Sequence, residues 1–149
     1  MKTGCFIFTL LICPISHAQV INIPDANFKN ALLNHNLVIN ANGDGEIQVN
    51  EAGYVINLEV SGGNISSLEG IEYFMNLLFL NCQSNYVINF DISQNFNHAN
   101  LLCAHNELIS LNISQNINLI ELSCSFNNLI SLDGSQNSNL LILDCSNNK

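Results

Sequence analysis

Positive charge is almost absent from this sequence. It has no arginine, and three lysines stand against twelve aspartates and glutamates, which gives a formal net charge of −9. A chain of this sign is repelled by nucleic acid and by anionic membrane surfaces, which argues against both as partners and favours a cationic or neutral partner. The alternative is that the acidic residues only keep an apolar, asparagine-rich surface soluble.

The familiar catalytic motifs are missing as well. The sequence has no G-x-S-x-G, no H-E-x-x-H and no phosphate-binding glycine loop. Cys103 and His105 are close in the chain, but Cys103 occupies a core position of the repeat described below, where a buried thiol is unreactive. We therefore predict that the chain is not an enzyme.

Long apolar segments are lacking too. The run Phe6–Cys13 is too short to span a bilayer, and no transmembrane segment is predicted. Because Lys2 precedes this run and Ser16-His17-Ala18 resembles a cleavage site, residues 1–18 are predicted to be a signal peptide of a secreted or cell-surface protein. Lipidation at Cys13 is an alternative that the bulky Ile12 disfavours.

The remaining sequence repeats with a period of 21 residues, as L-x-x-L-x-C-x-x-N-x-L-x-x-L. The cysteines of position six are Cys82, Cys103, Cys124 and Cys145, and the asparagines of position nine are Asn85, Asn106, Asn127 and Asn148. Position four holds Leu58, Leu80, Leu101, Leu122 and Leu143, and position eleven holds Ile65, Val87, Leu108 and Leu129. The first unit is one residue longer than the others. This is the leucine-rich repeat pattern with cysteine at a leucine position.

The spacing of these positions predicts an α/β solenoid. Positions four and six lie on one face of a short strand, and the asparagine turns the chain out of that strand while its amide bonds to backbone groups. Stacked units then form a parallel sheet on the concave face, with a continuous core behind it. Residues 55–149 form about 4.5 such units. The last unit stops one residue after its ninth position, and we expect the sequence to be the front part of a longer protein rather than to end in a ragged repeat.

The four repeat cysteines are predicted to be buried free thiols. Neighbouring units, each of which forms one rung of the solenoid, are about 4.8 Å apart, but parallel side chains do not converge as a disulfide requires. A zinc site is not expected, because no pair has the C-x-x-C spacing.

Residues 19–54 are predicted to form an N-terminal cap. A helix is expected from residue 25 to about residue 35, with Asp25 as its N-cap. Its apolar face, which would cover the open end of the solenoid core, holds Phe28, Ala31, Leu32 and His35.

The segment after this helix resembles an EF-hand calcium loop. It matches D-x-[DN]-x-[DN]-G-x₅-E except at its first position, where asparagine replaces aspartate. The candidate ligands are Asn40, Asn42, Asp44, Glu46 through its carbonyl, Gln48 through water, and Glu51 as the bidentate carboxylate. With two charged side-chain ligands, the expected Ca²⁺ affinity is weak, about 10⁻⁴–10⁻³ M. The alternative is a Gly-Asp-Gly turn that binds no metal.

A ligand would meet the outward positions three, five and seven of the strands. Among them, Phe79 and Leu102 are apolar on an otherwise polar sheet, and His105 and Phe126 at position eight lie at its rim. Apolar side chains beside a carboxylate such as Glu121 make a candidate docking patch. His98 takes a position where other units have leucine or valine, so we expect it to be packed and hydrogen-bonded.

These features together resemble secreted bacterial leucine-rich repeat proteins with asparagine- and cysteine-rich 21-residue units. The opening I-P-D-x-N-F-K is present as residues 23–29, and a cap followed by repeats is similar to the plan of the internalin-like adhesins. The resemblance implies a recognition role outside the cell, with a protein or a glycan as ligand. The alternative is a structural spacer of a larger exported protein, with calcium stiffening the cap. The sequence gives no evidence on the oligomeric state.

Overall fold

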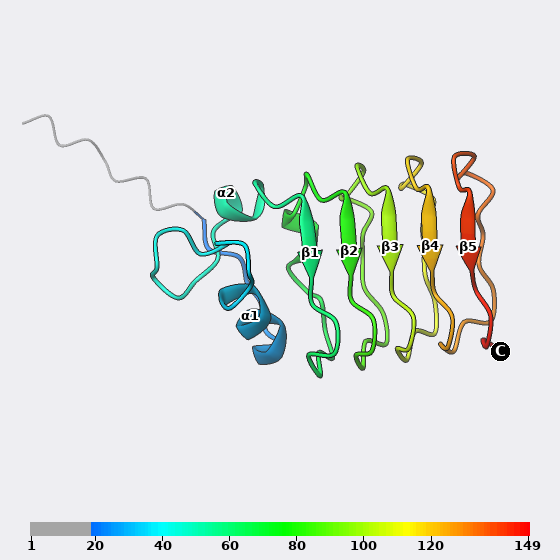
Figure 1. The fold of residues 1–149 in the computed structure, drawn as a ribbon, viewed down its shortest axis with the longest axis horizontal. Helices are drawn as coiled ribbons and strands as arrows, with labels where there is room; N and C mark the ends of the chain where they lie inside the picture. Colours follow the sequence, from blue (N-terminus) through cyan, green and yellow to red (C-terminus); the bar gives the residue numbers. More distant parts are fainter. Residues whose placement is uncertain (1–18) are drawn as a thin grey trace, which may run out of the picture.

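The protein is a short solenoid built on one parallel sheet, as seen in a computed structural model that describes residues 19–149 (Figure 1). The strands follow one another in the order β1-β2-β3-β4-β5. Their bounds are β1 Asn57–Glu59, β2 Phe79–Asn81, β3 Asn100–Leu102, β4 Glu121–Ser123 and β5 Ile142–Asp144. A 3-10 helix, η1, covers Ile71–Tyr73 in the first return segment. The predicted signal peptide, residues 1–18, and Cys13 with it, lie outside the described residues.

The register of the sheet follows the repeat alignment. Leu58 pairs with Leu80, Leu80 with Leu101, Leu101 with Leu122, and Leu122 with Leu143. The first step is 22 residues and the later ones are 21, so the longer first unit is absorbed outside the strands. The predicted α/β solenoid of leucine-rich repeats is therefore confirmed.

The core is a single column of apolar side chains behind the sheet. The position-four leucines of the first four strands are fully buried, as are Cys82, Cys103 and Cys124. In the fifth rung the same positions are open, because no further rung covers them: Leu143 is 49% exposed and Cys145 is exposed. Each rung thus depends on the next one to bury its apolar side chains.

Asparagine at position nine closes each turn, as predicted. The amide nitrogen of Asn106 donates to the carbonyls of Cys82, Cys103 and Ala104 at 3.0–3.3 Å, and its Oδ1 accepts from the backbone N–H of Val87 at 3.1 Å. One side chain therefore satisfies backbone groups of its own rung and of the preceding one, which a buried turn requires. The same ladder is repeated at Asn85, Asn127 and Asn148.

A second asparagine ladder on the far side of the solenoid was not predicted. Asn95, Asn116 and Asn137 are buried, and their amides donate to backbone carbonyls of the preceding rung at 2.9–3.0 Å. The sequence carries a signal for it, because S-Q-N recurs at residues 93–95, 114–116 and 135–137. Each rung is therefore joined to its neighbour by amide side chains at two bends.

His98 differs from the prediction in one respect. It is fully buried at the position that leucine fills in the neighbouring rungs, but within residues 19–149 its ring nitrogens make no hydrogen bond of ordinary geometry, and the Leu78 backbone offers only a weak interaction. Burial lowers its pKa to about 4, because the charged imidazolium would lose its hydration. The ring therefore stays neutral in the folded protein at physiological pH.

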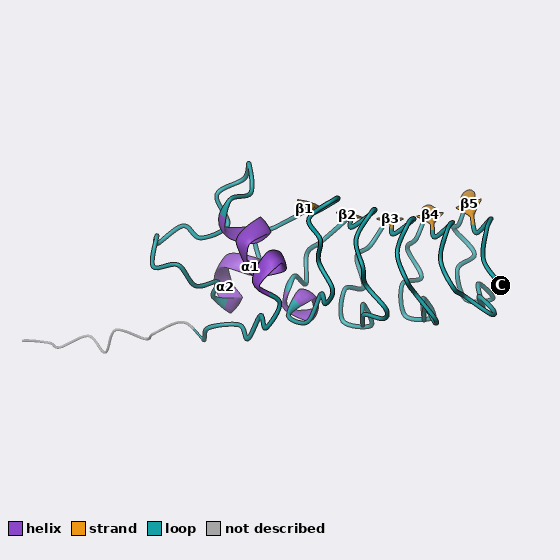
Figure 2. Cartoon of the chain, turned by 90° about the horizontal axis from the view of Figure 1, so that it is seen from below, coloured by secondary structure: helices purple, strands orange, loops and turns teal. Residues whose placement is uncertain are grey.

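The N-terminal residues form two short helices beside the first rung (Figure 2). Helix α1 covers Ala26–Leu33 and α2 covers Val49–Ala52. Phe28 and Leu32 of α1 are fully buried and belong to the same apolar cluster as the repeats. The helix ends two residues earlier than predicted, and His35 follows it in a turn. In the described part of the chain, no helix has both the length and the apolar character needed to cross a membrane.

Asp25 joins α1 to the first repeat. One carboxylate oxygen accepts from the backbone N–H of Phe28 at 2.8 Å, which is the predicted N-cap bond. The other oxygen accepts from the hydroxyl and backbone N–H of Ser66 at 2.6 and 2.9 Å and from the N–H of Ser67 at 3.1 Å. Burial works against ionisation here, but these hydrogen bonds outweigh it and lower the pKa of Asp25 below its usual value.

Candidate functional site: the sheet face and the loop of residues 40–51

The outer face of the sheet carries three of the predicted ligand-binding residues. Phe79 and Glu121 are at position three of their strands and Leu102 is at position five, and all three are half-buried. The carboxylate of Glu121 accepts from the amide of Asn100 on the neighbouring strand at 2.7 Å. Side chains on this face are thus held by cross-strand contacts while part of their surface stays open.

The other two predicted residues form a stacked pair at the carboxyl ends of the strands. The ring centroids of His105 and Phe126 are 4.4 Å apart and their planes differ by 9°. Both residues have left-handed backbone, with φ of 55° and 53°, because the chain reverses there before the position-nine asparagine. Both rings are exposed, so the pair offers a flat aromatic surface to solvent.

The predicted outward direction of position seven is wrong in the central rungs. Ala104 and Ser125 are buried, at 3% and 4% exposed. The strands end at position five, so the alternation of side chains stops before position seven is reached. The open part of the sheet face is therefore limited to positions three and five, with the ring pair beyond them.

The three buried repeat thiols have no features of a reactive site. Within the described residues, Cys82, Cys103, Cys124 and Cys145 are all free, as predicted, but Cys145 is exposed rather than buried because no further rung lies over it in the structure. Burial raises the pKa of Cys82 to about 12 and that of Cys124 to about 11, and it raises the pKa of Cys103 well above the usual range. A thiol held in its neutral form is a poor nucleophile, so the nearness of Cys103 to His105 in sequence has no chemical consequence.

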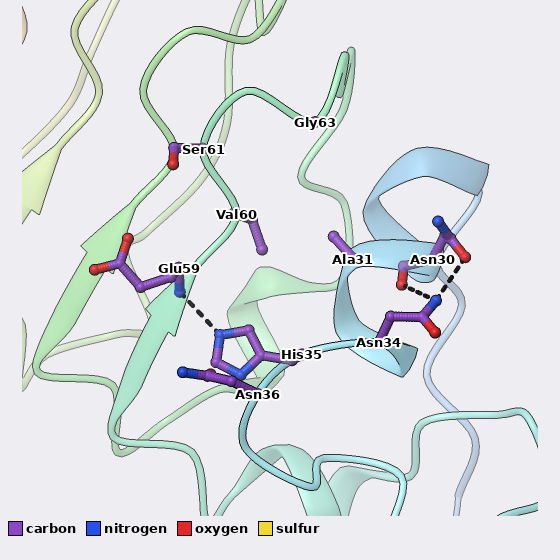
Figure 3. Close-up of a pocket in the computed structure, with 9 residues that line it drawn as sticks. All are labelled: Asn30, Ala31, Asn34, His35, Asn36, Glu59, Val60, Ser61 and Gly63. Atoms are coloured by element: carbon purple, nitrogen blue, oxygen red, sulfur yellow. Dashed lines mark hydrogen bonds between the residues drawn. The ribbon is translucent and has the colours of Figure 1, made fainter.

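A hollow lies where α1 meets the first strand (Figure 3). Its volume is about 300 Å³. It is lined by Asn30, Ala31, Asn34, His35, Asn36, Glu59, Val60, Ser61 and Gly63. The Nε2 atom of His35 accepts from the backbone N–H of Glu59 at 3.2 Å, which fixes the end of the helical segment to β1. Neither the hollow nor the hydrogen bond between His35 and Glu59 was predicted, since both depend on how α1 packs against β1.

The loop of residues 40–51 brings four of the six candidate calcium ligands into one hydrogen-bonded network. The Asp44 carboxylate accepts from the amides of Asn42 at 3.0 Å and Gln48 at 2.7 Å. Glu51 accepts through one oxygen from the N–H groups of Ala41 and Asn42, and through the other from the N–H of Gln48 at 3.0 Å. The carboxylates and amides of this network are the oxygen donors that Ca²⁺ prefers.

The two other candidate ligands are placed differently. The side-chain oxygen of Asn40 accepts from the N–H of Gly43 at 3.1 Å. The Glu46 carboxylate forms an ion pair with Lys29 at 2.7 Å, which leaves its backbone carbonyl as the predicted donor. Within residues 19–149, no three His, Cys, Asp or Glu side chains are grouped as a metal site, so a cation here would depend on amide and carbonyl oxygens as well.

Comparison with solved structures places the fold among known proteins. The functional domain of InlJ from Listeria monocytogenes, described as including a cysteine ladder, matches with 34% identity and a TM-score of 0.68, over 69% of this chain and 23% of that one. An internalin (inlF) from the same organism matches with 25% identity and a TM-score of 0.66, over 78% and 34%. Internalin C2 from L. monocytogenes, at 17% identity and a TM-score of 0.56, covers 89% and 70% and supports the fold alone. The chain thus spans about a quarter and a third of the first two relatives. No protein-family model and no curated protein matches it.

The parallel sheet, the 21-residue rungs and the asparagine ladder define the chain as a leucine-rich repeat protein. Within that class it is internalin-like, because its sequence and fold are similar to the InlJ domain over 69% of the chain and to the inlF internalin over 78% of it.

Proposed function

We propose that the chain is an exported recognition module that binds a protein or a glycan through its sheet face. The observation that carries this proposal is the exposed stack of His105 and Phe126 at the rim of a sheet face that also carries the half-buried Phe79 and Leu102. Aromatic and apolar groups next to polar side chains are typical of binding hot spots. The likeness to internalin domains supports an interaction role, and it supports export by analogy only.

The test is a paired substitution on this face. Phe79→Ser with Phe126→Ser removes the apolar contacts while the buried core and both asparagine ladders stay in place. Labelled wild-type chain and the double variant are applied to glycan and protein arrays, and we expect each specific signal of the wild type to fall at least tenfold, or about 1.4 kcal/mol, in the variant.

The matched control is Ile109→Ser with Ile130→Ser, which removes two exposed side chains outside the sheet face. A ligand that binds the Phe79/Phe126 variant as tightly as the wild type would show that the sheet face is not its site. Equal losses in both double variants would indicate non-specific adhesion.

We also propose that the loop of residues 40–51 binds calcium weakly and stiffens the N-terminal segment, which is the role expected of a structural spacer. The support is the convergence of Asn42, Asp44, Gln48 and Glu51. Bound calcium would require the amides of Asn42 and Gln48 to turn their oxygens inward. If the dissociation constant is about 1 mM, 5 mM calcium adds about 1 kcal/mol to the free energy of unfolding.

Calorimetry and thermal unfolding measure this directly. We expect a calcium-dependent rise in melting temperature that magnesium does not reproduce, and that is lost in Asp44→Asn. The absence of binding heat at millimolar calcium would leave the loop as a turn closed only by its own hydrogen bonds.

A further inference from the structure

An apolar stripe runs along the edge of the solenoid where the strands begin. It consists of Tyr54, Ile56, Leu78, Ile120 and Leu141, which are between 43% and 84% exposed, and we name it the edge stripe. Its members from Ile56 onward occupy position two of their rungs, with Ala99 between Leu78 and Ile120. Backbone hydrogen bonds of 2.8–2.9 Å connect these positions from rung to rung, so the side chains form one continuous row.

A second row extends the apolar surface. Met75, Phe96 and Ile117 are 50–55% exposed and recur every 21 residues. Each precedes an asparagine, and a hollow of about 330 Å³ is lined by Tyr54, Ile56 and Leu78 together with two of these asparagines, Asn76 and Asn97. The edge stripe therefore lines this depression together with the asparagines that follow Met75 and Phe96.

This surface is larger than the fold requires. Position two needs only to fit a corner of the turn, and polar residues would hold the same backbone bonds. Monomeric proteins seldom expose contiguous apolar surface over five successive rungs unless something binds there. The opposite bend carries a shorter row, Ile88, Ile109 and Ile130, without a comparable second row of apolar residues beside it.

The spacing of the edge stripe suits an α-helix laid across the rungs. Successive rungs are about 4.8 Å apart and one helical turn rises about 5.4 Å, so the apolar face of a helix meets about one rung per turn. The five rungs span about 19 Å, which corresponds to about 13 helical residues. An extended strand repeats its side chains on one face about every 6.6 Å and loses register within two rungs.

The charge of the repeats indicates which charge a partner bound at the edge stripe should carry. Residues 55–148 contain no lysine or arginine, and every charged side chain there at neutral pH is acidic. A second copy of the chain would bring two strongly negative surfaces together, which disfavours self-association. A helix whose polar face carries lysine or arginine would instead be attracted by the net negative charge of these repeats.

We infer that the edge stripe is a docking site for a basic amphipathic helix of a partner protein. It adjoins the sheet face where the strands begin, but the inference does not depend on the ligand proposed for that face. Leucine-like side chains of the helix fill the depression beside Tyr54 and the gap at Ala99, and its cationic face stays in solvent, attracted by the net negative charge of the repeats.

The test uses a fluorescent peptide of about 14 residues made of leucine and lysine, with all leucines on one helical face. Fluorescence polarisation measures its affinity for the chain and for three double variants. We expect Leu78→Ser with Ile120→Ser to weaken binding at least tenfold. We expect Ile88→Ser with Ile109→Ser, of matched chemistry and exposure, and Phe79→Ser with Phe126→Ser to bind like the wild type.

Four outcomes would overturn the inference. A scrambled peptide of the same composition that binds equally well would reduce the effect to charge attraction. Equal affinity of wild type and the Leu78/Ile120 variant would place the peptide elsewhere. Dimerisation that is lost in this variant, seen by analytical ultracentrifugation, would make a second copy the occupant. Binding to phosphatidylcholine vesicles that is lost in the same variant would make a lipid surface the occupant.

Discussion

The repeats and the N-terminal segment use different side chains to hydrogen-bond their backbone groups. In the repeats, buried backbone groups are satisfied by neutral amides, with Asn106 bonded to three carbonyls and one N–H group. In the N-terminal segment the same task falls to carboxylates: Asp25 accepts from Phe28, Ser66 and Ser67, and Glu51 accepts from three N–H groups of its own loop.

The difference follows from the backbone that each region must satisfy. A repeated turn presents carbonyls and an N–H group to the same point, and an amide can serve both, whereas a carboxylate only accepts. Helix starts and the loop of residues 40–51 present N–H groups alone, which suits a carboxylate. The repeats should therefore resist acid, and the N-terminal segment should be sensitive to it.

The largest expected effect comes from breaking the central ladder. Asn106→Ala leaves the N–H of Val87 and three carbonyls without their partner in a buried turn, so we expect the free energy of unfolding to fall by about 4 kcal/mol. Asn148→Ala removes the equivalent bonds at the open rung, where water can replace them, and should cost about 1 kcal/mol. Urea denaturation compares the two variants. Equal losses of stability would show that burial does not determine how much each asparagine contributes to the free energy of unfolding.

The next effect concerns His98, the titratable exception inside the repeats. Its folded pKa of about 4 lies below its unfolded value of 6.5, so the folded state takes up its proton later than the unfolded state as the pH falls. Stability is full above pH 6.5 and declines by on the order of 3 kcal/mol between pH 6.5 and pH 4. His98→Leu restores the residue of the neighbouring rungs and should remove this loss. The free energy of unfolding of both proteins, measured at pH 7 and at pH 4.5, tests this prediction. If the His98→Leu variant loses as much stability as the wild type, His98 is not the cause of the loss.

A smaller effect is expected at the junction between the two regions. Asp25→Ala removes the N-cap of α1 and its bonds to Ser66 and Ser67, at a cost of about 2 kcal/mol near neutral pH. Because the folded pKa of Asp25 is lowered, its contribution is present above about pH 3.8 and is lost as the pH falls through its folded pKa. The variant should lack that acid-dependent part.

Asn27→Ala is the control for this junction. It removes a neutral hydrogen bond of 2.8 Å between α1 and the carbonyl of Asn64, and it should cost less than 1 kcal/mol with no change in pH dependence. If both variants respond to acid alike, the carboxylate of Asp25 does not set the sensitivity of the junction.

Most of the repeat architecture could be predicted from residue spacing. The register of Leu58 with Leu80, the inward cysteines and the turn-closing Asn106 all follow from a fixed period, because each rung has the same environment. The prediction failed at two places. Position seven is buried at Ala104 and Ser125 because the strands end before it, and within residues 19–149 the buried ring of His98 makes no hydrogen bond of ordinary geometry.

The candidate sites were less predictable. Spacing could place His105 and Phe126 at the rim of the sheet, but their stacking depends on two left-handed turns that lie side by side. The calcium pattern identified six residues, and the structure groups four of them while turning the Glu46 carboxylate toward Lys29. The edge stripe was not predicted, because each rung contributes a single position-two residue to it and these residues look like scattered apolar side chains in the sequence.

By itself, the sequence determined the period, the strand positions, the burial of Cys82, Cys103 and Cys124, and Asp25 as the N-cap of α1, since these depend on local spacing and on contacts between identical neighbours. Only the tertiary structure decided what the ends and the surface do. The second oxygen of Asp25 finds Ser66 and Ser67, the rings of His105 and Phe126 meet, and the edge stripe becomes continuous, because stacking brings together residues that no local pattern relates.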